Sequence, residues 1–317
     1  MLYVNISGTS LEILKNLVLA GVQPAIFDGR PYMDTISNKP TPLINKFKAE
    51  VDVAEYDATA KRPRLNSASV ASFIRPIVHE MNPLLEECVI DERPLSSIPD
   101  HEFSKFDVVI ASHISKADAI RIAKATVGAG GKFILVDSFG LMGCAVLDMG
   151  KDHLFRREEG KDKLSHPTTN SNYVPFETII TLELSNMKKG RWDKFPPLPW
   201  AIYKSYLDFQ QFHGHFPSNT TSDQFVDFAK NWLKDQSKGN GLHVSDDLFG
   251  STEEIKCLAC IANEEVSPVC AVLGGVVGNE VIKCLSGKGE PANNVLLFEG
   301  AESSCRAFFV CSTIDQT

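Results

Sequence analysis

The chain has 317 residues, of which 43% are hydrophobic, and a formal net charge of −8. This length fits one large α/β domain or two smaller ones, with enough apolar residues for a sizeable core. The acidic balance argues against a general nucleic-acid binder, because such proteins bind mainly by neutralising phosphates. We expect no transmembrane segment, because polar residues interrupt the apolar stretch 266–285, and no signal peptide, because the first residues lack a basic leader.

The first 28 residues predict a βαβ unit. Residues 2–6 and 24–28 form short apolar strands, and residues 11–20 carry apolar side chains at helical spacing. Asp28 ends the second strand 20 residues after Gly8, which is the spacing of a dinucleotide-binding unit.

The alternation of strand and helix then resumes after a polar, proline-bearing crossover at 29–66. The basic residues Lys61, Arg62 and Arg64 in this crossover fit either a nuclear import signal or a solvated loop. The elements expected next are a helix at 67–81, strands at 88–90 and 106–111, a helix at 115–127, and strands at 132–137 and 144–147, the last of them antiparallel. This order predicts an α/β fold with a Rossmann-like, mainly parallel sheet and helices on both faces.

The character of the sequence changes near residue 151. The segments expected there are a polar loop at 151–172, a strand at 178–183, helices at 200–213, 222–236, 252–262 and 266–285, and closing strands at 295–298 and 306–311. We therefore divide the chain into a Rossmann-like domain (1–150), a polar loop with a small helical insertion (151–265), and a helix with strands that complete the fold (266–317).

The turn after the first strand is the first candidate site. A nucleotide turn uses three glycines, which permit the tight bend, the approach of the backbone to phosphate and the packing of helix on strand. The matching positions here are Asn5, Gly8 and Ser10, so only the middle one is glycine. Asn5 can adopt a positive φ, and Ser10 could serve as a helix N-cap. We favour a vestigial turn that binds no nucleotide by itself, although the βαβ frame and Asp28 remain.

No catalytic or metal-binding constellation is predicted. No cysteine lies between Cys144 and Cys257, where a thioester cysteine would be sought, and most cysteines sit in apolar segments. Cys257 and Cys260 could suggest zinc or redox chemistry, but they lie in a helical pattern without a second pair. Five histidines, at positions 113, 153, 213, 215 and 243, are expected in loops or on polar faces.

The helix at 266–285 is the most informative segment. Pro268 opens it, Gly274 and Gly275 interrupt it, and Asn279 and Glu280 form a polar patch. Two glycines inside a helix cost about 1 kcal/mol each relative to alanine, which is tolerable where another backbone approaches closely. A buried core helix and an interface helix both fit this pattern.

The same helix carries a family resemblance. Together with Asn293 and Asn294 before a strand, it resembles the adenylation domain of ubiquitin-like activating enzymes (the ThiF/MoeB-like family), and in particular the smaller, non-catalytic subunits of heterodimeric SUMO-activating enzymes. Further resemblances lie at 14–22, 81–83, 106–109 and 137–143, so that most of the chain is covered.

The resemblance implies a pseudo-symmetric heterodimer. The large catalytic subunit would bind ATP and magnesium and carry the thioester cysteine, while this chain would bind no cofactor alone and would support the adenylation of SUMO. The interface would include Pro268, Gly274, Gly275, Asn279 and Glu280. Family members carry a helix with an arginine before the first strand, and this sequence starts at the strand. The expected location is the nucleus, with the cytoplasm second.

Three alternatives remain open. The chain could be the regulatory subunit for the Nedd-type modifier, which usually carries a longer helical insertion than 150–250 allows. It could be a nicotinamide-dependent oxidoreductase, which would need an intact glycine turn. It could also be a scaffold outside any enzyme complex.

Overall fold

The computed structural model of the protein describes residues 1–35, 68–157, 159, 164–170, 172–188, 196–238 and 243–311. The basic residues Lys61, Arg62 and Arg64 lie outside these ranges. Within them, eight strands form one mixed sheet in the order β10-β9-β6-β5-β4-β1-β2-β3. Their bounds are β1 Leu2–Val4, β2 Ala25–Phe27, β3 Val89–Asp91, β4 Val108–Ala111, β5 Lys132–Phe139, β6 Met142–Asp148, β9 Val295–Glu299 and β10 Ser304–Phe308.

The five strands β1 to β5 run parallel, and β6, β9 and β10 extend the sheet in antiparallel pairs. Parallel strands need crossover connections, and these are made by helices on both faces. The predicted α/β, Rossmann-like architecture is therefore confirmed, including the antiparallel strand at 144–147. The division into 1–150, 151–265 and 266–317 stays a prediction.

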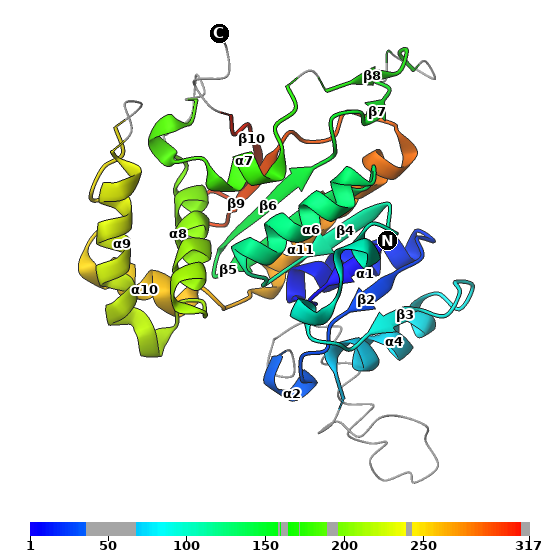
Figure 1. Ribbon diagram of the computed structural model, residues 1–317, viewed down its shortest axis with the longest axis horizontal. Coiled ribbons are helices and arrows are strands. Elements are labelled where there is room, and N and C mark those ends of the chain that lie inside the picture. Colours follow the sequence, from blue (N-terminus) through cyan, green and yellow to red (C-terminus); the bar gives the residue numbers. More distant parts are fainter. Residues whose placement is uncertain are drawn as a thin grey trace.

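Helices cover each face of the sheet (Figure 1). One face carries α6 (Lys116–Gly128), α7 (Phe176–Thr181) and α8 (Leu198–His213), and the other carries α1 (Gly8–Leu19), α4 (Val70–Met81) and α11 (Ser267–Ser286). Alternate strand residues separate the two cores, because Leu2 and Val4 join the first and Tyr3 the second. The shorter helices are α2 (Tyr32–Thr35) and α5 (Asp100–Phe103).

The helical insertion contains α8, α9 (Ser222–Gln236) and α10 (Thr252–Ile261) and stands at one end of the sheet (Figure 1). Ser251 and Glu254 form a capping box at the start of α10. The polar segment at 151–172 contains a small hairpin of β7 (Leu154–Phe155) and β8 (Thr168–Thr169).

The predicted strand at 178–183 was wrong, because residues 176–181 form α7. The run from Thr178 to Thr181 is β-branched and favours a strand locally. Phe176, Ile179 and Ile180 nevertheless share one helical face, and all three are buried in the core. Tertiary packing of this face decides the conformation.

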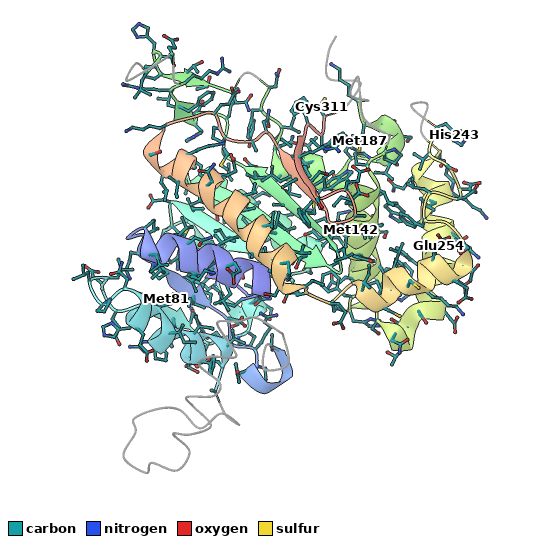
Figure 2. The ribbon with its side chains drawn as sticks, turned by 180° about the vertical axis from the view of Figure 1, so that it is seen from behind. Met81, Met142, Met187, His243, Glu254 and Cys311 are labelled. Carbon is teal, nitrogen blue, oxygen red and sulfur yellow. The ribbon has the colours of Figure 1, made fainter. Side chains whose placement is uncertain are left out.

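Two observations concern the segment predicted as the apolar helix at 266–285. The helix α11 is long and apolar enough to span a membrane, because its most apolar 18-residue stretch has a mean hydropathy of 1.5. Half of that stretch is buried inside the protein. Figure 2, drawn from behind, shows α11 lying beside α1 across the sheet. The absence of a transmembrane segment stays a prediction, and packing against α1 explains the apolar composition of the buried side.

Candidate functional site

The β1–α1 turn lies where a Rossmann-like sheet places its ligand. The chain proceeds from β1 to β2 on one side and later returns to β4 on the other side of β1, so the strand order reverses at this point. Ligands of open α/β sheets bind outside the carboxyl ends of the strands at this reversal. The turn at 5–8 after β1 and the segment at 112–113 after β4 meet there. The side-chain nitrogen Nδ2 of Asn5 donates a hydrogen bond to the backbone carbonyl oxygen of His113 at 3.2 Å.

The backbone of the turn keeps the required shape. Asn5 has φ of 57°, the conformation for which a glycine is usually chosen. The suggested N-cap role of Ser10 was wrong, because Ser7 is the N-cap and Ser10 is the third helical residue of a reciprocal capping box. Both serine side chains are consumed within this box.

The backbone N–H groups that would cradle a phosphate are engaged by this chain's own side chains. Ile6 donates to Asp28 Oδ2 at 2.7 Å, and Ser7 donates to Ser10 Oγ at 2.7 Å. Gly8 donates to the Glu265 carboxylate, whose two oxygens both lie at 2.9 Å. Ser7 and Ser10 are at most 1% exposed, so the turn is also closed to solvent.

Asp28, the acid at the position that binds ribose in a nucleotide-binding unit, is likewise hydrogen-bonded within the chain. The Arg30 guanidinium donates to both oxygens of Asp28, from Nε at 2.9 Å and from Nη2 at 2.7 Å. Nη2 also donates to the Ile6 carbonyl oxygen at 2.8 Å. Because the Asp28 side chain is fully buried under this fork, the carboxylate that would receive a ribose hydroxyl is satisfied internally.

A buried cluster of charged and polar groups backs the turn. His113 Nε2 lies 3.8 Å from Glu265 Oε1, and its Nδ1 lies 3.6 Å from Asp137 Oδ1. Asp137 also accepts hydrogen bonds from the His113 backbone at 2.8 Å and from the Tyr203 hydroxyl at 2.7 Å. Burial raises the pKa of Asp137, and the neighbouring His113 and the Tyr203 hydrogen bond oppose that rise. His113 lies in the loop between β4 and α6, as expected, and its side chain is only 12% exposed.

Together these contacts engage the N–H groups of Ile6, Ser7 and Gly8 and the Asp28 carboxylate, which are the groups that a nucleotide would use. Asn5, Gly8, Ser10 and Asp28 come together in space, and each has a structural role. Arg30 and Glu265 were missed from the sequence. The Asp-x-Arg spacing could have pointed to Arg30, whereas nothing local distinguishes Glu265 from Glu264.

The cysteines offer no activated nucleophile. Cys88, Cys144 and Cys284 are buried. Burial raises the pKa of Cys88 and Cys284 to about 11, and it raises the pKa of Cys144 as well. Cys257 and Cys260 are exposed on α10. Among the described residues, no group of three or more acidic, histidine or cysteine side chains could hold a metal ion.

The second candidate site is the outer side of α11. The exposed residues on this side, which we name the α11 outer face, are Pro268, Ala271, Val272, Gly275, Asn279, Ile282, Leu285 and Ser286. The apolar Val272, Ile282 and Leu285 are 44–46% exposed. A Cβ on Gly275 would meet no atom within 4 Å, so this position is open.

The other two predicted interface residues face inward. A Cβ on Gly274 would lie 2.7 Å from Glu12 Cβ, so this glycine permits the close approach of α11 to α1. Glu280 is 5% exposed and accepts hydrogen bonds from Lys283 Nζ and from the Ala292 backbone, both at 2.7 Å. Gly274 and Glu280 therefore make contacts within this chain. Of the predicted interface residues, only Pro268, Gly275 and Asn279 are exposed.

Known proteins are similar to this chain in sequence along nearly its whole length. The chain is 26% identical over 328 residues to SUMO-activating enzyme subunit 1 of Danio rerio, and the match covers 96% of this chain and 86% of that protein. It is 24% identical to the proteins of the same name from Dictyostelium discoideum and Homo sapiens, again over 96% of this chain.

The chain resembles SUMO-activating enzyme subunit 1 from end to end. This confirms the resemblance predicted from the terminal helix and the shorter motifs. No protein-family model matches the chain.

Proposed function

We propose that this chain is the regulatory subunit of a SUMO-activating enzyme, in which it supports the ATP-dependent adenylation and thioester activation of SUMO by a larger catalytic partner. The match over 96% of the chain to proteins named SUMO-activating enzyme subunit 1 carries this proposal. The word "subunit" in that name accords with a chain that needs a partner.

The closed turn supports the passive role. Its N–H groups and Asp28 are engaged by Ser10, Glu265 and Arg30, so the residues present do not fit a bound nucleotide. ATP and magnesium would therefore be bound by the partner subunit. The partner would also carry the reactive cysteine.

The α11 outer face supports the heterodimer. Exposed valine, isoleucine and leucine on one helix side are costly to leave in water, and their burial stabilises an association. Gly275 lies among them without a side chain, which allows a partner helix to approach the backbone closely. We assign this face to the large subunit, with Pro268 and Asn279 at the contact, and we place the complex in the nucleus.

The test is reconstitution of the first half-reaction. The purified chain should show no ATP–pyrophosphate exchange, and exchange should appear when the large SUMO-activating subunit and SUMO are added. A SUMO thioester on the large subunit should form in the same mixture. Strong exchange by the chain alone would overturn the proposal.

The same assay, an NAD titration and co-purification together separate the alternatives. A regulatory subunit for the Nedd-type modifier would give exchange only with that modifier and its own large subunit. If the chain is a nicotinamide-dependent oxidoreductase, titration of the isolated chain with NAD should quench its tryptophan fluorescence. A scaffold would co-purify with partners without restoring exchange.

A further inference from the structure

Glu265 lies where a phosphate would sit in a nucleotide-binding member of this fold. It follows α10, Val266 alone separates it from α11, and its side chain is 1% exposed. Both of its carboxylate oxygens lie 2.9 Å from the Gly8 nitrogen, which belongs to the first residue of α1. The contact joins residues 257 positions apart in the sequence.

The electrostatics of this position favour an anion. The N-terminus of a helix carries a partial positive charge and free N–H groups, which is why phosphates bind there. Glu265 supplies a negative group from within the chain, and His113 Nε2 faces the same carboxylate at 3.8 Å.

The segment that carries Glu265 is fixed to the sheet at a second point. Gly140, at the end of β5, donates its N–H to the Glu264 carbonyl oxygen at 2.7 Å. Residues 264 and 265 thereby connect the start of α11 to both the β1–α1 turn and the β5–β6 turn. The position of α11 on the sheet thus depends on contacts that this segment makes.

We propose that Glu265 is a built-in anion that occupies the phosphate position of the β1–α1 turn, closes it to external ligands and ties the start of α11 to α1. The inference concerns this chain alone and holds whichever partner it binds. Its consequence is that removing the carboxylate should open an anion site bounded by the Gly8 N–H and His113.

The first test is anion rescue of Glu265→Ala in the full chain. The substitution should lower the melting temperature by about 5 °C, the scale expected for the loss of a buried charged hydrogen bond. Inorganic phosphate or pyrophosphate at about 20 mM should restore about 3 °C relative to potassium chloride of equal ionic strength. The unsubstituted chain should show no such preference.

Glu12→Ala is the matched control. Glu12 lies in α1 and pairs with Lys15 rather than with a helix N-terminus. Counted over the whole residue, backbone included, Glu12 is 7% exposed and Glu265 is 6% exposed. This variant should show no preference for phosphate over chloride. A preference equal to that of Glu265→Ala, or none in either variant, would overturn the proposal.

Glu265→Gln keeps the test decisive if the alanine variant does not fold. It preserves volume and one acceptor for Gly8 but removes the negative charge. We expect a melting temperature at least 3 °C below that of the unsubstituted chain, without rescue by phosphate, because no space is opened. A melting temperature equal to that of the unsubstituted chain would contradict a role for the charge.

Discussion

The β1–α1 turn and the α11 outer face lie on the same side of the sheet and differ in how their groups are satisfied. In the turn, the N–H groups of Ile6, Ser7 and Gly8 have partners from this chain, and the segment is buried. On the α11 outer face, large apolar side chains are exposed around an open glycine. The turn is complete within the chain, whereas we propose that another molecule covers the α11 outer face.

The difference shows how one fold can exchange a ligand site for a subunit role. A nucleotide turn loses its ligand when internal side chains supply the same hydrogen bonds and charges, without any change in the sheet. A helix becomes an interface when apolar residues remain on its solvent side. The following experiments alter one region at a time.

The largest effect is expected on the α11 outer face. Gly275→Glu places a charge where we propose that the partner packs, and burying it unpaired should weaken association at least 100-fold, or about 3 kcal/mol. The free chain should keep its melting temperature, because no atom lies within 4 Å of the new Cβ. Affinity for the large subunit would be measured by surface plasmon resonance. Gln211→Glu on the exposed side of α8 is the control, and equal weakening by both variants would exclude a specific role for α11.

The adjacent glycines should respond in opposite directions to alanine. Gly274→Ala should lower the free energy of unfolding by about 2 kcal/mol, because its Cβ would lie 2.7 Å from Glu12 Cβ. Gly275→Ala should raise it by about 1 kcal/mol through helix propensity. Urea unfolding of both variants measures the difference, and equal responses would show that α1 and α11 do not pack as described.

The Arg30–Asp28 pair should matter more than a similar exposed pair. Arg30→Met leaves Asp28 buried without its guanidinium and should lower the free energy of unfolding by about 2 kcal/mol. Arg93 forms the same kind of ion pair with Asp91, two residues before it, but the Arg93 side chain is 52% exposed. Arg93→Met should therefore lower the free energy of unfolding by at most about 0.5 kcal/mol. Equal losses in urea unfolding would mean that burial at the turn is unimportant.

An effect of similar size that depends on pH is expected at Lys204, a buried lysine in α8. Its ammonium donates to the carbonyl oxygens of Ile180 and Leu182, and burial lowers its pKa to about 7. Because Lys204 binds its proton more tightly in the unfolded chain than in the folded one, its burial lowers the free energy of unfolding. This destabilisation is complete below pH 7 and disappears as the pH rises toward 10.5.

Lys204→Met should remove this pH dependence. Its stability relative to the unsubstituted chain should fall by on the order of 2 kcal/mol between pH 7 and pH 9.5. Unfolding in urea at both pH values measures the change, with the exposed Lys234→Met as control. A difference that does not change with pH would indicate that Lys204 titrates normally.

Much of the fold follows from local patterns in the sequence. The alternation of apolar strands and amphipathic helices predicted the parallel sheet, and the helix predicted at 222–236 coincides with α9. The error at 178–181 arose because β-branched residues favour a strand, while the helical spacing of Phe176, Ile179 and Ile180 carried the decisive information. Local propensity and tertiary burial disagreed there, and burial prevailed.

The candidate site was only half predictable. The missing glycines at positions 5 and 10 indicated a degraded turn, because their roles are local to βαβ units. The groups that close the turn could not be found in this way, since Glu265 reaches Gly8 across 257 positions and depends on the fold itself. The same limit applied to Gly274 and Gly275, whose different roles depend on which side of α11 faces α1.

The central claim is that this chain cannot hold a nucleotide by itself. Isothermal titration of magnesium ATP into the isolated chain tests it most directly. We predict no saturable binding up to millimolar ATP. One-to-one binding in the micromolar range, abolished by a substitution in the β1–α1 turn, would contradict the account.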